Sequence, residues 1–156
     1  ERVRRVRKYL GDDENFMLTY GDGVSDINIK ALVDFHFKQG TIGTITGVKS
    51  VNRFGLLNIS QENNLINNFY QHNINEFNAN DFPTDYINGG FMVFKREIFD
   101  YILPNTMIES AFMSLAEKKQ LSVYKHNGGW KCMDNYKEME EMNELWQKNP
   151  FWKVWQ

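Results

Sequence analysis

The sequence predicts an α/β domain, and three observations support this fold class. An apolar run at residues 16–20 (FMLTY), a segment with helical periodicity and a β-branched run at residues 41–48 (TIGTITGV) follow one another, which is typical of a β-α-β unit. A further strand-like run at residues 86–94 extends the sheet. The 156 residues are 42% hydrophobic and 24% charged, which suits one modest globular domain or part of one.

The opening elements follow from this periodicity and from residues that begin or end helices. In residues 1–10, apolar side chains recur at helical spacing among five basic ones, and the chain opens on Glu1, so we expect part of a longer protein. Asp26 or Asn28 can cap the next helix, and Gly40 ends it. The unit over residues 16–48 therefore predicts two parallel strands joined by a right-handed crossover.

The middle of the chain predicts antiparallel structure. Residues 54–60 and 65–70 flank a polar turn and read as a hairpin, whereas the asparagine-rich residues 72–85 read as an exposed loop. In the strand at residues 86–94, Gly89 and Gly90 indicate a bulge or a place where a ligand meets bare backbone.

The last third predicts two helices, a strand and a final amphipathic helix. Residues 97–102 and 107–116 read as helices, and residues 121–124 as a strand. An apolar segment then ends at Asp134 and precedes the last helix, before an aromatic tail at residues 151–155. We expect that helix to be amphipathic, with one face made of Tyr136, Met139, Met142, Leu145 and Trp146.

Charge and composition exclude several functions. Eighteen basic residues oppose twenty acidic ones, so no strong field favours nucleic acid or an anionic membrane as a partner. One cysteine, Cys132, and three scattered histidines offer neither a disulfide nor a cysteine-based zinc site. No apolar run approaches the roughly 18 residues of a spanning helix, and we expect a cytoplasmic protein.

Two aspartates are the candidate catalytic and metal-binding residues. Asp22 and Asp134 each follow a strand-like segment, where ligands of α/β sheets bind. Mg²⁺ takes oxygen ligands, often one or two carboxylates plus substrate phosphates, so this pair is a sufficient protein contribution. The alternative interpretation is that Asp22 only forms a turn and Asp134 only caps the last helix.

The candidate substrate-binding residues carry weaker signals when each is taken alone. Gly21 and Gly89 could let phosphate or sugar oxygens approach the backbone, although such glycines also serve in turns and bulges. Arg53 could reach a phosphate or remain a solvated surface residue, and His72 has the same two interpretations. Trp130 and the terminal tryptophans read first as packing residues.

Taken together, several motifs resemble the glucose-1-phosphate cytidylyltransferases, a family of bacterial sugar-phosphate nucleotidyltransferases. The resemblance runs from end to end of the chain. It rests on residues 5–11 (RVRKYLG), 18–26 (LTYGDGVSD), 53–55 (RFG), 87–91 (INGGF), 130–134 (WKCMD) and 150–155 (PFWKVW).

The resemblance implies a fold, a reaction and a set of site residues. The fold would be the C-terminal part of a Rossmann-like domain with a mixed sheet (GT-A-like), on which a smaller antiparallel portion binds the sugar. The reaction would convert CTP and a sugar 1-phosphate, α-D-glucose 1-phosphate in the family, to a CDP-sugar and pyrophosphate, in a homo-oligomer at full length. Asp22 and Asp134 would hold Mg²⁺, and the sugar phosphate would lie near Gly55, Asn88 and Gly89, with Arg53 and Trp130 beside them.

Two departures from the family pattern limit what the resemblance implies. The glycine-rich nucleotide-binding loop of the family is absent from residues 1–156, so we expect this chain alone to be inactive. His72 stands where the family has a phosphate-binding lysine, and an imidazole gives a weaker charge-assisted contact, which leaves the sugar open.

Two other functions stay open at this stage. The chain could be a non-catalytic half that binds a sugar phosphate or a subunit without turnover. It could also resemble a metal-dependent glycosyltransferase, but Asp22 is followed by Gly23 and Val24 rather than by the second acid of an Asp-x-Asp motif.

Overall fold

The computed structural model describes residues 2–49, 56–60, 62–70 and 86–155. A short helix α1 (Arg2–Val6) and the 3₁₀ turn η1 (Arg7–Tyr9) open the chain. They are followed by β1 (Asn15–Thr19), β2 (Gly23–Ser25), α2 (Ile29–Gln39), β3 (Gly43–Lys49), β4 (Leu56–Ile59), β5 (Ile66–Tyr70), β6 (Tyr86–Lys95), η4 (Arg96–Asp100), α3 (Glu109–Glu117), β7 (Leu121–His126), β8 (Trp130–Cys132) and α4 (Tyr136–Lys148).

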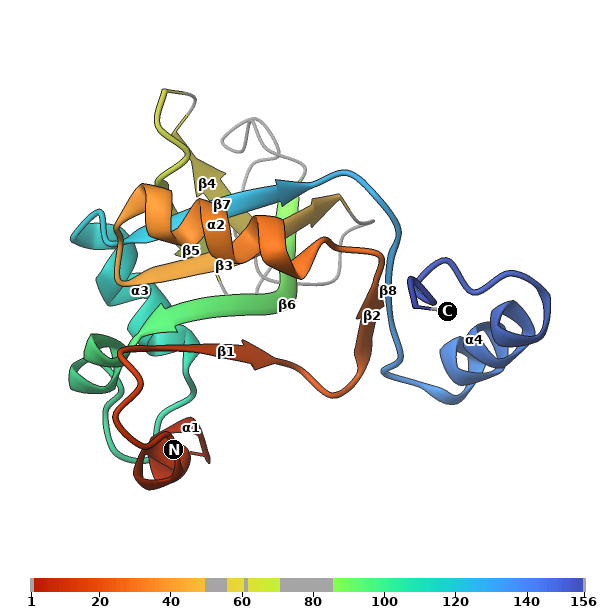
Figure 1. Cartoon of the computed structure of the whole chain (residues 1–156), viewed down its shortest axis with the longest axis horizontal. Helices are drawn as coiled ribbons and strands as arrows, with labels where there is room; N and C mark the ends of the chain where they lie inside the picture. Colours follow the sequence, from red (N-terminus) through yellow and green to blue (C-terminus); the bar gives the residue numbers. More distant parts are fainter. Residues whose placement is uncertain (1, 50–55, 61, 71–85, 156) are drawn as a thin grey trace.

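The central sheet is mixed, as the family resemblance implied, and β6 is the strand at its centre (Figure 1). The strand order is β5-β4-β6-β3-β7, and β1 also pairs with β6. Strands β3 and β7 are parallel, whereas the pairs that β6 makes with β1, β3 and β4 are antiparallel. A separate antiparallel sheet joins β2 to β8.

The predicted β-α-β unit forms, but its strands are not neighbours. Because β1 and β3 are both antiparallel to β6, they run in the same direction with β6 between them. Helix α2 connects them, capped by Asn28, whose side chain accepts from the Ala31 amide at 2.9 Å. Gly40 ends the helix with φ +70°, as the sequence predicted.

The predicted hairpin is confirmed as β4 paired with β5, and β4 meets β6 through Leu56 and Ile87. The predicted bulge in β6 is confirmed as well. Ile45 lies opposite Met92 and Gly47 opposite Asn88, so Thr46 alone faces the segment that contains Gly89 and Gly90. The loop predicted at residues 72–85 lies outside the described residues.

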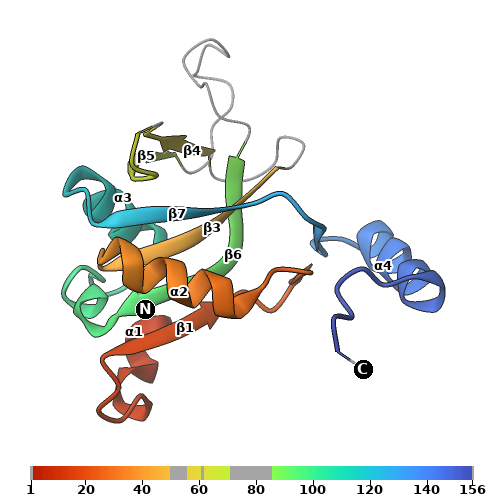
Figure 2. The same cartoon turned by 45° about the horizontal axis from the view of Figure 1, so that its top comes forward.

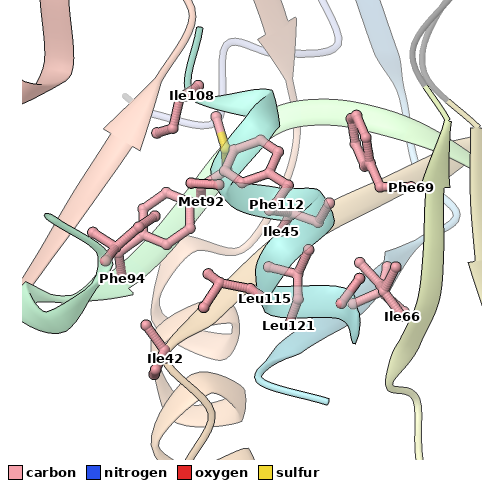
Figure 3. Packing of buried hydrophobic residues seen from close by; sticks show 14 of the residues in the cluster. Ile42, Ile45, Ile66, Phe69, Met92, Phe94, Ile108, Phe112, Leu115 and Leu121 are labelled. Carbon is pink, nitrogen blue, oxygen red and sulfur yellow. The ribbon is translucent and has the colours of Figure 1, made fainter. Parts of the chain in front are cut away.

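Helices cover the two faces of the sheet and bury two apolar clusters (Figures 1 and 2). Alternation along β6 serves both faces, since Val93 packs in one cluster with Leu32 of α2, while Met92 and Phe94 belong to the larger cluster. Figure 3 shows Phe112 and Leu115 of α3 against Phe94 and Ile45, and the Phe94 and Phe112 rings stack at 5.7 Å.

The predicted final helix is confirmed as α4, and none of its residues is buried in the described structure. It lies apart from the central sheet, beyond β8 (Figures 1 and 2). On its predicted apolar face, Tyr136 is 70% and Trp146 48% exposed. Among the described residues, no helix combines the length and apolar character that crossing a bilayer requires.

Candidate functional site

The β2–β8 ribbon, which we define as the two-stranded sheet of these strands, brings the two candidate aspartates to the same end. In its register Gly23 pairs with Cys132, and one step outward the Met133 amide donates to the Asp22 carbonyl at 2.9 Å. Asp134 is the next residue. The main chains that carry the two carboxylates therefore lie side by side although the residues are far apart in sequence.

The other end of the ribbon is closed by polar contacts to one carbonyl. The Ser25 hydroxyl donates to the Gly129 carbonyl at 2.7 Å, and the Asp26 amide reaches the same oxygen at 3.3 Å. Beside them His126 Nε2 lies 2.8 Å from an Asp26 oxygen. These contacts fix the register of the ribbon and hence the residues that meet at its far end.

The pKa of the Cys132 thiol shows that the aspartate end of the ribbon is negatively charged. Burial raises its pKa to about 12, with further contributions from the charges of Asp134, Glu138 and Asp22 in that order. Both candidate aspartates thus act on one thiol. The thiol is therefore protonated near neutral pH, and Asp134 and Glu138 offer the oxygen ligands that Mg²⁺ prefers.

Glu138 belongs to this acidic group, and the sequence reasoning missed it. One potential ligand atom each from Cys132, Asp134 and Glu138 lies within 4.8 Å of the others. The Asp134 amide donates to a Glu138 carboxylate oxygen at 2.8 Å. A signal was available: Glu138 is three residues after Asn135, whose side chain caps α4 by accepting from the Glu138 amide.

The bulge of β6 forms the second part of the site. Gly90 adopts φ +79°, and its amide donates to the Asn88 side-chain oxygen at 3.0 Å. The Gly90 carbonyl accepts from the Tyr20 amide at 3.1 Å. The bulge is therefore tied to the segment that leads from β1 into Gly21 and Asp22.

Trp130 joins the bulge to the β2–β8 ribbon. Its indole Nε1 donates to the Gly89 carbonyl at 2.7 Å. A Cβ added at Gly89 would come within 2.7 Å of Val48, so close packing alone demands glycine there. A Cβ at Gly21, by contrast, would meet no atom within 4 Å.

A tyrosine and a glutamate under the bulge were not predicted as site residues. The Tyr20 hydroxyl donates to a Glu109 oxygen at 2.7 Å, and the Asn88 amide nitrogen approaches the same hydroxyl at 3.5 Å. Burial raises the pKa of Tyr20, and the hydrogen bond to Glu109 raises it further, so the phenol stays neutral. Glu109 comes from the first turn of α3, and no local motif indicates that this turn meets the residue after β1.

Of the predicted site, the structure places Asp22 and Asp134 on neighbouring main chains and joins Trp130 to Gly89, which follows Asn88. Among the described residues, the ligand atoms that gather with Asp134 come from Cys132 and Glu138 and not from Asp22, which Gly21 precedes. Three further predicted residues, Arg53, Gly55 and His72, lie outside the described residues, and their roles stay predictions.

No protein-family model matches this sequence. Individual proteins are similar to it over almost its whole length. A Bacillus subtilis protein assigned as a glucose-1-phosphate cytidylyltransferase is 38% identical over 158 aligned residues. The glucose-1-phosphate cytidylyltransferase of Salmonella typhi is 34% identical. Each alignment covers 99% of this chain and 58% of the relative, so the chain spans a little over half the length of these proteins.

Solved structures share the fold at low sequence identity. A Bacillus anthracis protein assigned as a glucose-1-phosphate thymidylyltransferase superposes with a TM-score of 0.71 at 15% identity, over 94% of this chain and 59% of that one. HddC from Yersinia pseudotuberculosis gives 0.70 at 17% identity, over 92% of this chain and 60% of that one. The whole of this chain is therefore homologous to one part of the glucose-1-phosphate cytidylyltransferases, and its fold is that of sugar nucleotidyltransferases.

Proposed function

We propose that this chain contributes the metal-binding and sugar-phosphate-binding part of a cytidylyltransferase. The reaction would transfer a cytidylyl group from CTP to a sugar 1-phosphate, with α-D-glucose 1-phosphate as the first candidate, and release pyrophosphate. The observation that carries the proposal is the hydrogen bond between the Met133 amide and the Asp22 carbonyl. It supports a shared role for Asp22 and Asp134, which neither residue would have in a turn or a cap alone.

The residues present fit a magnesium ion by their chemistry. Asp134 and Glu138 offer carboxylate oxygens close to one another, and the main chain of Asp22 lies beside that of Met133, next to Asp134. Asp22 and Asp134 would hold the ion, with Glu138 orienting the Asp134 main chain. Bound Mg²⁺ would supply neutralisation of phosphate charge, which phosphoryl-type transfers need more than a protein base.

The chain's own residues would bind and orient the sugar phosphate. One Asn88 donor hydrogen points to Tyr20, while the side-chain oxygen is engaged by Gly90, so the amide orientation is fixed. A fixed amide can direct its remaining donor hydrogen at a sugar oxygen. A phosphate oxygen of the sugar would then attack the α-phosphorus of CTP in line, and pyrophosphate would leave.

The remaining contacts to CTP would come from the part of the relatives that this chain does not span. A decisive experiment extends the chain with the corresponding N-terminal segment of the Bacillus subtilis relative and measures pyrophosphate release from CTP with glucose 1-phosphate. We expect release that Asp22→Asn and Asp134→Asn each reduce by at least about a hundredfold, whereas the exposed control Asp34→Asn leaves it unchanged.

The outcomes separate the proposal from its main alternative. No pyrophosphate from any hexose 1-phosphate tested would overturn the enzymatic function. Calorimetry that showed sugar-phosphate binding by the same extended chain without turnover would favour the non-catalytic module. That alternative is supported by the coverage of 58% of the relative, because a chain that matches only part of an enzyme can bind a sugar phosphate without the nucleotide contacts.

A further inference from the structure

A chain of hydrogen bonds under the bulge of β6 runs from α3 to Asn88. The Tyr20 hydroxyl donates to a Glu109 carboxylate oxygen at 2.7 Å, and Asn88 Nδ2 lies 3.5 Å from the same hydroxyl. On the other side of the amide, the Asn88 side-chain oxygen accepts from the Gly90 amide at 3.0 Å. The first two contacts join residues 89 and 68 positions apart in the sequence, so only the folded chain assembles them.

Each hydrogen bond in this chain has a fixed direction. An ionised carboxylate only accepts, so the single hydroxyl proton of Tyr20 is committed to Glu109. The hydroxyl oxygen is then left to accept, which suits Nδ2 of Asn88 and not its side-chain oxygen. The Gly90 amide only donates and therefore demands the Asn88 oxygen. Glu109 and Gly90 thus impose the same orientation on the amide from its two sides.

The position of Glu109 in α3 suits it to this task. It lies in the first turn of the helix, where the positive end of the helix dipole favours a carboxylate. In the part of the chain that the structure describes, no ion pair involves Glu109, and the group that satisfies its carboxylate is the Tyr20 hydroxyl. A half-buried carboxylate without a cation is stabilised by such a bond, so the Tyr20 proton stays with it.

The orientation of the amide decides what Asn88 offers to a ligand. With the side-chain oxygen bonded to Gly90 and one Nδ2 hydrogen directed at Tyr20, one donor hydrogen remains, for which the described residues provide no partner. A donor attracts a phosphate oxygen or a sugar oxygen. An amide turned the other way would present its own oxygen and repel a phosphate.

We propose that Glu109 and Tyr20 form a positioning pair that keeps the remaining N–H of Asn88 available to an oxygen of the sugar phosphate. This inference rests on the proposed function, because that function places the sugar phosphate beside Asn88. Neither member of the pair touches the substrate. Glu109 acts through Tyr20, and Tyr20 acts through Asn88.

The test measures binding of α-D-glucose 1-phosphate to the 156-residue chain by isothermal titration calorimetry. Tyr20→Phe removes the hydroxyl, and Glu109→Leu removes the acceptor at similar volume, so each should raise the Kd about tenfold. Glu109→Gln keeps an acceptor oxygen for the Tyr20 proton and should recover most of the affinity. The matched control is Glu117→Gln, which changes an exposed carboxylate on the same helix and should leave the Kd unchanged.

A double-mutant cycle separates positioning from a general effect on the fold. If Glu109 acts only through Tyr20, Glu109→Leu should cause no further loss of affinity in the Tyr20→Phe background. Additive losses would overturn the proposal, as would single variants that bind as tightly as the unchanged chain. An unchanged chain that binds no glucose 1-phosphate would overturn it as well.

NMR of the unchanged, ligand-free chain tests the orientation directly and needs no variant to fold. One Nδ2 hydrogen of Asn88 should give a nuclear Overhauser effect to the Tyr20 side chain, and Glu109→Gln should preserve it. The absence of this signal would show that the amide is turned the other way, against the proposal.

The reaction and the positioning pair can fail independently. Pyrophosphate release by the extended chain that is insensitive to Tyr20→Phe and Glu109→Leu would overturn the pair and leave the proposed reaction intact. Sugar-phosphate binding that depends on the pair, without pyrophosphate release, would retain the pair and overturn the reaction.

Discussion

Gly90 is the residue on which the geometry of the bulge depends most directly. Its φ of +79° is strained for any other residue, and an added Cβ would come within 2.9 Å of the Tyr20 ring. We expect Gly90→Ala to lower the free energy of unfolding by about 2–4 kcal/mol, combining backbone strain with overpacking. Urea denaturation of the chain at neutral pH measures this loss.

Gly40 supplies the matched control for that substitution. Its φ of +70° is similar, yet a Cβ there would meet no atom within 4 Å. Gly40→Ala should therefore cost only the backbone strain, about 1–2 kcal/mol. Equal losses in the two variants would show that the Tyr20 ring yields without cost and does not anchor the bulge.

His36 makes the stability of the chain depend on pH. Its side chain is fully buried, with Nδ1 2.8 Å from the Thr44 hydroxyl and Nε2 3.3 Å from the Asn15 side-chain oxygen. Burial, together with a smaller contribution from the charge of Lys95, lowers its pKa from 6.5 to about 4. The folded state therefore holds the imidazole neutral where the unfolded chain binds a proton.

The direction of the pH effect follows from this difference. Above about pH 6.5 both states are neutral and the contribution is constant; as pH falls from 6.5 towards 4, the unfolded state gains protons first and stability drops. The full drop amounts to about 3 kcal/mol. Urea unfolding at several pH values should show it, and an NMR titration that gave His36 an ordinary pKa would contradict it.

At the scale of elements, the β2–β8 ribbon depends on its link to β6. Trp130→Phe keeps the aromatic body but removes the Nε1 hydrogen bond to the Gly89 carbonyl. We expect a loss of about 1 kcal/mol and faster amide exchange at residues 21–25, because the ribbon is then held to the sheet less firmly. Trp155→Phe, at a position 56% exposed, is the control and should change neither quantity. Unchanged exchange in Trp130→Phe would show that other contacts hold the ribbon.

Local signals explain which elements could be predicted from the sequence. Asn28 and Gly40 bound α2, and Gly89 and Gly90 mark the bulge, because capping and positive φ act within a few residues. The insertion of β6 between β1 and β3 could not be predicted, since strand pairing depends on contacts between distant residues. Periodicity indicated that α4 has an apolar face but not whether the rest of the chain covers it.

At the scale of the whole molecule, the same limit applies to the site. Asp22 and Asp134 were predicted because each follows a strand, and the ribbon register explains why their main chains meet. Glu109 was missed because its contact with Tyr20 joins α3 to the residue that follows β1, far away in the sequence. Sequence motifs were therefore sufficient to predict the two aspartates, whereas the hydrogen bond between Tyr20 and Glu109 could be found only from the three-dimensional packing.

The acidic end of the ribbon should make stability of the whole chain respond to Mg²⁺ even without nucleotide. A ligand that binds only the folded state at about five times its Kd stabilises by about 1 kcal/mol, which raises the Tm of a chain this size by about 2–4 °C. We expect this shift in thermal unfolding at constant ionic strength, and its loss in Asp22→Asn and in Asp134→Asn. Asp34→Asn, which changes an exposed carboxylate on α2, should retain it. A shift of equal size in all three variants would mean that Mg²⁺ acts on the general charge of the surface, and the two aspartates would then share no ion.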